Sequence, residues 1–244
     1  MEQQNLPLFY QNPVALNMES HAGMTVSSSP LGYRFAASTQ SVMLSTSEFF
    51  SACRQFPIFF IHSEEGPLFP VALLGVEEHE NLFVDAEGVW TGQYIPAYIR
   101  RYPFITTNGS EGQTTVCFDE AFDGFNLEGG APLFDDGEAT EKTREIQAFL
   151  QEYLLQVQQS REFGAMLLKE GLLKQVDAQA NMASGKSFSV KGLLVVDEQK
   201  LSQMADGDLV KLFRNGSLAL VYAHLLSLQN LTTLVNLKAK TQKD

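Results

Sequence analysis

The fold of the first half of this chain is set by Ile58-Phe-Phe-Ile61, Glu64-Glu-Gly-Pro67 and Val71-Ala-Leu-Leu74. The first and third segments are short apolar runs, and the polar segment between them contains a glycine and a proline, two residues that turns prefer. Two apolar runs separated by such a turn are typical of an antiparallel hairpin. The pattern therefore predicts two buried strands that pair with each other.

Similar signals follow this hairpin. Asn81-Leu-Phe-Val84 and Val89-Trp90 flank the turn-like segment Asp85-Ala-Glu-Gly88, which predicts a second strand–turn–strand unit. Thr114-Thr-Val-Cys-Phe118 is a further strand candidate, because β-branched and aromatic residues favour strands.

A short helix is predicted just before the hairpin. Ser45 and Glu48 have the spacing of a capping box, in which each side chain satisfies a backbone N–H of the first helical turn. The helix should end near Gln55, because Pro57 restricts the backbone of the residue before it.

The two halves of the chain differ in composition. All nine prolines lie between Pro7 and Pro132, and 20 of the 26 aromatic residues precede Asp135. Because proline and aromatic residues favour strands, turns and packed loops, we expect an α+β fold of the mainly antiparallel kind. In this prediction, residues 1–244 form a single domain with two lobes. Residues 1–134 are β-rich, and residues 135–244 are mostly helical with one strand near 188–196.

The second half carries helical patterns. Asp135 and Glu138 are spaced as a helix start, and an apolar stripe then runs through Ile146, Leu150, Tyr153 and Val157 at helical spacing. The apolar residues from Phe163 onward are out of phase with this stripe. We therefore expect one long helix with a break near residues 158–162.

Three more helix starts are expected. Asp197 and Asp206 are predicted N-caps of two short helices, and Ser217 is the predicted cap of a final helix that reaches about Leu237. Residues 215–237 contain no charge and are long enough to span a membrane. Polar side chains such as His224 and Gln229 are costly in hydrocarbon, so we expect this helix to pack in a soluble protein, without a transmembrane segment.

Composition excludes several classes of protein. A net charge of -12 disfavours a nucleic-acid-binding surface, because phosphates need basic partners. Two cysteines, Cys53 and Cys117, cannot form a disulfide scaffold, and we expect both thiols to stay unpaired. The first residues show neither a basic nor an apolar segment of a signal peptide, so we expect a cytoplasmic protein. Leaderless export to the cell surface remains open.

Other motifs carry no chemistry. Residues 180–187 resemble a phosphate-binding loop, but a polar segment precedes them and a strand-like segment follows, so we expect no nucleotide binding. The acidic run Glu77-Glu78-His79-Glu80 is expected to be a solvated surface segment rather than a metal site. No histidine pair has ligand spacing, and His224 is expected to be a core residue. We therefore expect no metal and no cofactor, and the catalytic residues stay unknown.

The segment from Trp90 to Phe104 has the highest density of candidate binding residues. It contains the single tryptophan and the single adjacent arginine pair of the sequence. Arginine binds carboxylates and phosphates through two parallel hydrogen bonds and stacks on aromatic rings. One interpretation is therefore an aromatic-walled anion pocket, and the other is that both arginines pair with acidic residues of their own half. The candidate ligand-binding residues of the anion pocket are Trp90, Tyr94, Tyr98, Arg100, Arg101 and Tyr102. Because adjacent side chains diverge, one arginine should pair with a carboxylate and the other should face a cleft near Trp90 and Tyr94.

The chain resembles the SapC family of bacterial proteins associated with surface layers. The resemblance extends over nearly the whole chain and is most specific at Tyr94-Ile-Pro-Ala-Tyr-Ile-Arg-Arg-Tyr-Pro-Phe104. The other matching pieces are Tyr10-Gln-Asn-Pro-Val14 with His21, Glu48-Phe49, Gln55-Phe-Pro-Ile-Phe-Phe60, Glu80-Asn-Leu-Phe-Val-Asp85 with Gly88 and Trp90, Leu133-Phe-Asp-Asp-Gly137, Val196-Asp-Glu198 and the segment 216–228. The resemblance implies a link to surface-layer proteins or outer-membrane receptors, and it supplies no catalytic residues.

Two hypotheses follow. The first is an accessory binding protein that recognises a surface-layer or receptor-associated polypeptide or a small anionic ligand. His21 joins the candidate ligand-binding residues in this hypothesis. The second is an enzyme with Arg100 or Arg101 as substrate anchor and His21 or His224 as proton carrier. The first is favoured because no nucleophile–base set emerges, and self-association into a homo-oligomer stays open.

Overall fold

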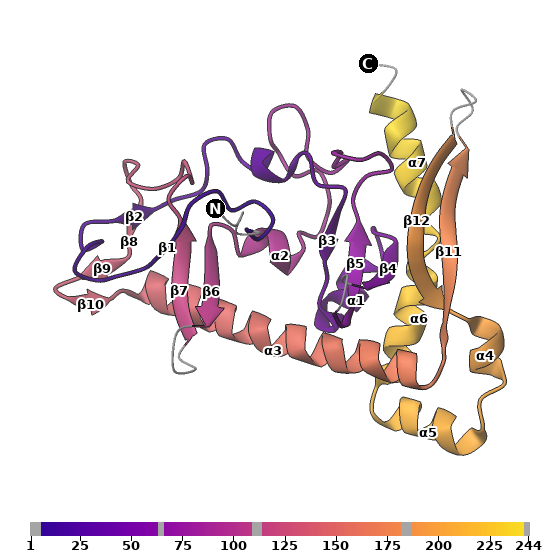
Figure 1. Ribbon diagram of the computed structural model, residues 1–244. Coiled ribbons are helices and arrows are strands. Elements are labelled where there is room, and N and C mark those ends of the chain that lie inside the picture. The colour runs from indigo at the N-terminus through magenta and orange to yellow at the C-terminus, as the bar shows by residue number, and fades with distance from the viewer. Residues whose placement is uncertain (1–5, 63–65, 109–113, 182–186, 242–244) are drawn as a thin grey trace, which may run out of the picture.

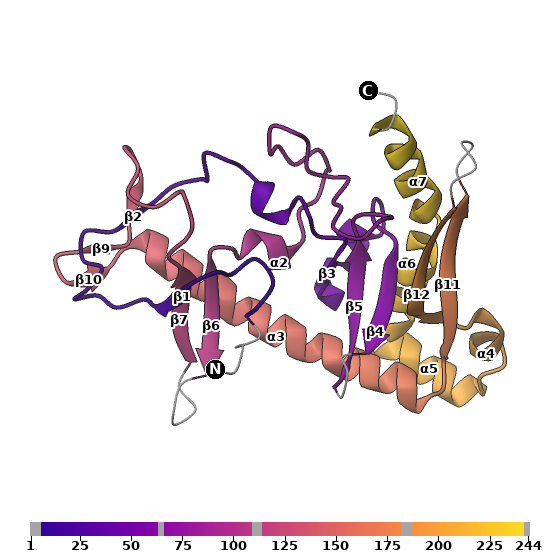
Figure 2. The same cartoon turned by 45° about the horizontal axis from the view of Figure 1, so that its top comes forward.

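A computed structural model describes residues 6–62, 66–108, 114–181 and 187–241 (Figure 1). Antiparallel sheets lie mostly in the first half of the chain and helices mostly in the second, so the fold is α+β, as predicted. The long helix α3, Glu141–Lys169, runs beneath both main sheets in the two views of Figures 1 and 2. It packs against β5 of one sheet and β6 of the other.

The larger sheet has five strands in the order β11-β12-β4-β5-β3, all antiparallel to their neighbours. The predicted hairpin is confirmed, because β4 pairs with β5 along its whole length. The strands are β3 (Ser41–Met43), β4 (Ile58–His62), β5 (Leu68–Leu73), β11 (Leu173–Asn181) and β12 (Ser187–Val196). The second half of the chain therefore completes the sheet that the first half begins.

Strand β12 is the strand predicted near residues 188–196, and β11 is an additional one. Residues 174–179 are too polar for a buried strand, but β11 lies at the edge of the sheet, where Lys174, Gln175 and Asp177 are exposed. The interpretation of these residues missed the strand because an edge strand needs no apolar run.

The smaller sheet has three strands in the order β1-β7-β6. These are β1 (Pro13–Ala15), β6 (Phe104–Asn108) and β7 (Thr114–Asp119), and the last confirms the predicted strand at 114–118. The remaining short strands pair as β2 (Thr25–Val26) with β8 (Ala131–Pro132), and β9 (Phe134–Asp135) with β10 (Glu138–Ala139). The strand–turn–strand unit predicted at 81–90 is reduced to one bridge, between Val84 and Trp90.

The helical turn before the hairpin has the predicted capping box at Ser45 and Glu48. It consists of η2 (Thr46–Glu48) and α1 (Phe49–Ala52) and ends before Pro57, as predicted. The other short helices of this half are η1 (Arg34–Ala36) and α2 (Ala97–Arg100).

The predicted start of the long helix is wrong. Asp135 and Glu138 belong to the β9–β10 turn, where Gly137 has a φ of 75°, a conformation that suits glycine. Helix α3 instead begins after Thr140, whose side chain accepts a hydrogen bond from the backbone N–H of Thr143. The predicted break near residues 158–162 is also wrong, since α3 is continuous through this segment.

The stripe of α3 stays in phase because two small residues continue it. Ser160 and Gly164 extend the spacing of four and three residues from Val157 to Leu167, and both are buried. The hydroxyl of Ser160 accepts a hydrogen bond of 2.8 Å from the backbone N–H of Thr46. Gly164 touches β5, since a Cβ atom added there would lie 2.7 Å from the carbonyl oxygen of Leu68. A search for apolar residues overlooks both positions.

A pair of alanine substitutions tests this close approach. We expect Gly164→Ala to lower the free energy of unfolding by about 1–3 kcal/mol, because the added methyl group meets the backbone of a central strand. Gly207→Ala is the matched control in helix α5, where an added Cβ meets no atom within 4 Å. It should raise the free energy of unfolding by roughly 0.5–1 kcal/mol through helix propensity. Urea unfolding of both variants checks the opposite signs, and two changes of the same sign would contradict the packing of α3 on β5.

The described residues 198–241 contain four helices. They are α4 (Glu198–Ser202), α5 (Asp206–Arg214), α6 (Ser217–Ser227) and α7 (Asn230–Thr241). Asp197 is the N-cap of α4, as predicted, and accepts a hydrogen bond from the backbone N–H of Gln199. Asp206 and Ser217 are not N-caps but the first residues of their helices, after Ala205 and Gly216. Gly216 provides the cap because its φ of 80° is a left-handed conformation.

The predicted final helix is divided into α6 and α7 near Leu228. By length and composition, residues 217–241 could cross a membrane, and 28% of the most apolar part of this stretch is buried. A helix from the core of a soluble protein also has such a composition. Val221 and His224 of α6 are fully buried, whereas Tyr222 and Leu226 are exposed. Packing of this helix in a soluble protein therefore stays a prediction.

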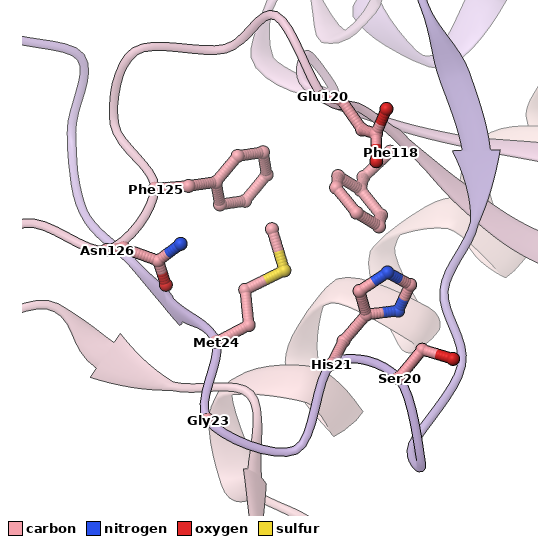
Figure 3. A pocket seen from close by; sticks show the side chains of 8 residues that line it. All are labelled: Ser20, His21, Gly23, Met24, Phe118, Glu120, Phe125 and Asn126. Carbon is pink, nitrogen blue, oxygen red and sulfur yellow. The ribbon is translucent and has the colours of Figure 1, made fainter.

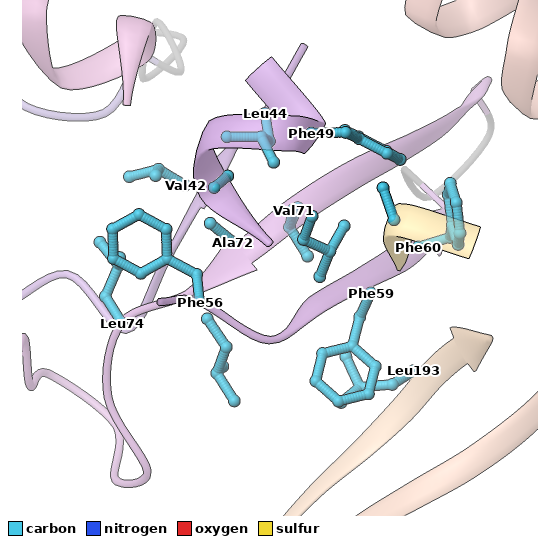
Figure 4. Close-up of a cluster of buried hydrophobic side chains, with 14 of the residues drawn as sticks. Val42, Leu44, Phe49, Phe56, Phe59, Phe60, Val71, Ala72, Leu74 and Leu193 are labelled. Atoms are coloured by element: carbon cyan, nitrogen blue, oxygen red, sulfur yellow. The ribbon is translucent and has the colours of Figure 1, made fainter. Parts of the chain in front are cut away.

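The main core lies on both faces of the larger sheet (Figure 4). Phe59 and Phe60 are neighbours on β4 and point to opposite faces, and both are buried. Phe59 lies beside Leu193 of β12, while the ring of Phe60 lies 4.9 Å from that of His224 in α6. A sheet covered on both faces explains why β4 has a continuous apolar run rather than an alternating one.

Candidate functional site

Helix α2 carries the adjacent arginines and is held in place by Glu48. Pro96 is its N-cap residue, and the backbone N–H of Ala97 donates a hydrogen bond of 2.7 Å to Oε1 of Glu48. The Tyr94 hydroxyl donates to the same oxygen at 2.8 Å, and the backbone and hydroxyl of Ser45 donate to Oε2. The Glu48 carboxylate is 4% exposed. It thus connects the capping box of residues 45–48 to the start of α2.

Arg101 lies among aromatic rings. Its guanidinium carbon is 4.0 Å from the ring centre of Tyr98, 5.1 Å from that of Tyr153 and 5.9 Å from that of Tyr10. Burial raises the pKa of Tyr10 and Tyr153 well above the usual range, although the charge of Arg101 opposes the shift. The phenols therefore stay neutral and stabilise Arg101 through their ring faces. Its Nε is buried and has no hydrogen-bond partner among the described residues.

Arg100 points away from Arg101, because consecutive residues of a helix diverge by about 100°. Its side chain is exposed, its Nε donates a hydrogen bond of 2.9 Å to the carbonyl oxygen of Ile95, and its guanidinium carbon lies 5.3 Å from the ring centre of Phe149 and 5.9 Å from that of Tyr94. Neither arginine pairs with a carboxylate in the described parts of the chain. The expected ion pair of one arginine is thus replaced by aromatic contacts.

Two neighbouring cavities share Arg100 and Lys142. One has a volume of about 230 Å³, and its lining includes Arg100, Arg101, Lys142, Glu145 and Phe149. The other has a volume of about 670 Å³ and also contains Arg100 and Lys142, together with Tyr102 and other aromatic side chains. We call the two cavities together the Arg100 groove. Three cationic side chains and one carboxylate, that of Glu145, therefore line the groove.

The predicted aromatic residues have different places around this groove. Tyr102 lines it, stacks on Phe35 at 4.3 Å, and donates a hydrogen bond of 3.1 Å to Asp119. Tyr94 and Tyr98 flank the two arginines as described above. Trp90 lies apart from them, since it is 8% exposed, stacks on Phe83, and donates its indole N–H to the carbonyl oxygen of Tyr94. Trp90 thus supports the segment that precedes α2.

Neither histidine of the enzyme hypothesis lies near an arginine. His21 lines a separate cavity with Phe118 and Phe125 (Figure 3). His224 is fully buried, and its Nε2 accepts a hydrogen bond of 3.1 Å from the backbone N–H of Val196. Burial lowers the pKa of His224 to about 4, so this imidazole is neutral near pH 7. The cavities that contain Arg100 contain no histidine, and the cavity of His21 contains no arginine.

The acidic run at 77–80 is not a free metal-binding segment. Glu77 and Glu80 both accept hydrogen bonds from the ammonium group of Lys238 in α7. In the described part of the chain, no cluster of acidic, histidine and cysteine side chains is suited to a metal ion. Cys53 and Cys117 are both free. The phosphate-loop-like segment lies largely outside the described residues, at 182–186.

Sequence reasoning missed Lys142 and Phe149, which α3 brings to the groove. The two residues follow Arg100 by more than 40 positions, and the helical segment that contains Lys142 has no distinctive sequence motif. No local pattern marks them. Their spacing could have placed them on one face of a helix, but only the fold shows that this face meets α2.

Comparison with known proteins gives one match. The SapC family model matches residues 16–234, a range that includes the whole of helices α2 and α3. No curated protein and no solved structure matches the chain.

Proposed function

This chain belongs to the SapC family, and we propose that it is an accessory binding protein that recognises an anionic group, a carboxylate or a phosphate, in the Arg100 groove. The ligand that carries this group is a polypeptide or a small molecule. SapC membership implies a link to surface layers or outer-membrane receptors. The proposed partner is therefore a surface-layer or outer-membrane receptor polypeptide.

The observation that carries the proposal is the convergence of Arg100, Arg101 and Lys142 on the groove, where neither arginine pairs with a carboxylate of the described residues. Lys142 pairs with Glu145 at 3.4 Å, and both side chains are about half exposed. Such a pair contributes little and is easily exchanged. The two guanidinium groups therefore supply positive charge that an anionic ligand can neutralise.

The walls of the groove indicate the kind of anion. Tyr33, Phe35, Tyr102 and Phe122 all line the larger cavity. A guanidinium beside aromatic rings suits a carboxylate or phosphate attached to a flat or apolar body, because the ring faces bind the body while the arginine binds the charge. An isolated inorganic ion would leave these rings unused.

The geometry favours binding over catalysis. A proton carrier must lie within hydrogen-bond distance of the reacting group, and neither His21 nor His224 shares a cavity with an arginine. The arrangement required by the enzyme hypothesis is therefore missing from the described residues.

Titration calorimetry with phenyl phosphate and benzoate tests the proposal. We expect both to bind, and the neutral analogue benzyl alcohol to bind at least ten times more weakly. Arg100→Gln and Lys142→Gln should each weaken benzoate binding about tenfold, the loss expected for one charge-assisted hydrogen bond. Arg54→Gln removes an equal charge at an exposed position outside the groove and is the control.

Equal binding of benzoate and benzyl alcohol would contradict recognition of the negative charge. The same conclusion follows if Arg54→Gln weakens benzoate binding as much as Arg100→Gln, because the effect would then come from net charge alone.

A further inference from the structure

The cavity that contains His21 differs in charge from the Arg100 groove. Its volume is about 550 Å³, and Glu120 is the single charged residue in its lining, which contains no lysine or arginine. One oxygen of the Glu120 carboxylate accepts a hydrogen bond of 2.6 Å from Asn12. The other oxygen has no partner among the described residues and is free to bind a ligand.

Aromatic rings form the inner wall of this cavity (Figure 3). The rings of Phe118 and Phe125 lie 5.1 Å apart and nearly perpendicular, and the His21 ring meets Phe118 edge-on at 5.0 Å. The thioether of Met24 lies between Phe125 and His21. Aromatic faces carry partial negative charge and attract cations.

The hydrogen bonds around His21 hold its ring in the wall of the cavity. Its Nδ1 accepts a hydrogen bond of 3.0 Å from the backbone N–H of Asn17. The side-chain oxygen of Asn17 in turn accepts hydrogen bonds from the backbone of Glu19 and Ser20, which fixes the turn. The imidazole therefore keeps a fixed place beside Phe118.

We propose that this cavity binds an organic cation, an amine or a quaternary ammonium group, with Glu120 neutralising the charge and Phe125 and Met24 packing against the carbon substituents. The surrounding charge favours such a ligand, because the first 134 residues contain fifteen acidic and four basic side chains. An acidic surface concentrates cations at a cavity of this kind. The site is separate from the Arg100 groove and does not depend on the function proposed for it.

The test compares benzylamine, which is protonated at pH 7, with benzyl alcohol, which has nearly the same shape and no charge. Binding is followed by the NMR chemical shift of the Met24 methyl group, which lines the cavity. We expect benzylamine to bind about ten times more tightly than the alcohol. Glu120→Gln should remove this preference, whereas Glu128→Gln, an exposed acid outside the lining, should keep it.

A second variant changes the wall of the cavity without removing any of its contacts. Gly23 lines the cavity, and a Cβ atom added there meets no atom within 4 Å, so we expect Gly23→Leu to fold normally. The leucine side chain is expected to occupy part of the cavity and to weaken benzylamine binding at least tenfold. Arg100→Gln should leave benzylamine binding unchanged, which separates this site from the groove. Equal affinity for the two probes, absence of benzylamine binding, or a preference that survives Glu120→Gln would each overturn the proposal.

Discussion

Replacing Glu48 with alanine is expected to lower the free energy of unfolding by about 4 kcal/mol, because several buried donors lose their acceptor together. Its carboxylate accepts four hydrogen bonds, from the backbone and hydroxyl of Ser45, the hydroxyl of Tyr94 and the backbone of Ala97. Burial and the nearby charge of Glu48 raise the pKa of Tyr94 well above its usual range, so the hydroxyl remains a donor. The Ser45 hydroxyl also contacts Ser47 and Gln156, whereas the other three donors have no second acceptor among the described residues.

Two further variants separate hydrogen bonding from loss of charge. Glu48→Gln keeps one acceptor oxygen but turns an NH₂ group toward one pair of donors, so we expect a loss of about 2 kcal/mol. Glu87→Ala removes an exposed acid in a loop and should change stability by less than about 0.5 kcal/mol. Guanidinium unfolding measures all three, and a Glu48→Ala protein as stable as Glu87→Ala would show that Glu48 does not anchor α2.

The same variant has a functional consequence. Helix α2 begins at the N–H that Glu48 binds and carries Arg100 three residues later. We therefore expect the fraction of Glu48→Ala protein that stays folded to bind benzoate more weakly than the wild type. Unchanged benzoate affinity would mean that the groove is held by α3 alone.

The sequence predicted those parts of the fold whose signals are local. The β4–β5 hairpin and the Asp197 cap were found because a turn or a cap depends on residues within a few positions of one another. The continuity of α3 was mispredicted for the opposite reason. Ser160 and Gly164 hold its stripe in phase through contacts with Thr46 and Leu68, and neither residue is apolar enough to show this in the sequence.

The candidate site was predicted only in part for a related reason. Arg100, Arg101 and Tyr102 stand out because an arginine pair among tyrosines is unusual, and all three line the Arg100 groove. Lys142 and Phe149 join them only because α3 passes beneath α2. His21 belongs to a different segment that resembles the family, and it lies in another cavity. A single sequence contains no information on which distant segments meet, so grouping His21 with the arginines had no geometric basis.

Acidification provides the second large effect, because His224 is buried without a charged partner among the described residues. Its ring lies against Phe60, and its Nε2 accepts the backbone N–H of Val196. Burial lowers its pKa to about 4, whereas an unfolded chain has the ordinary value of 6.5. Between these pH values the unfolded chain binds a proton that the folded protein does not, so stability falls as pH falls.

The expected loss is about 3 kcal/mol between pH 7 and pH 4, since each pKa unit corresponds to about 1.4 kcal/mol. The stabilising contribution is complete above pH 6.5 and disappears as the pH approaches 4. Melting curves at half-unit steps measure it. His224→Gln gives the backbone N–H of Val196 an acceptor that does not titrate, so this variant should lose less stability on acidification. It should also be less stable than the wild type at pH 7.

The NMR signal of the His224 ring provides the direct control, because acidic residues also contribute to any melting curve below pH 5. In the folded protein this signal should stay at its neutral position down to about pH 4.5. If the signal moves to its charged position above that pH, or if His224→Gln has the same pH dependence as the wild type, the imidazole is reached by water. Helix α6 would then not be packed on β4 as the structure has it, because the Phe60–His224 contact leaves no room for a solvated, charged ring.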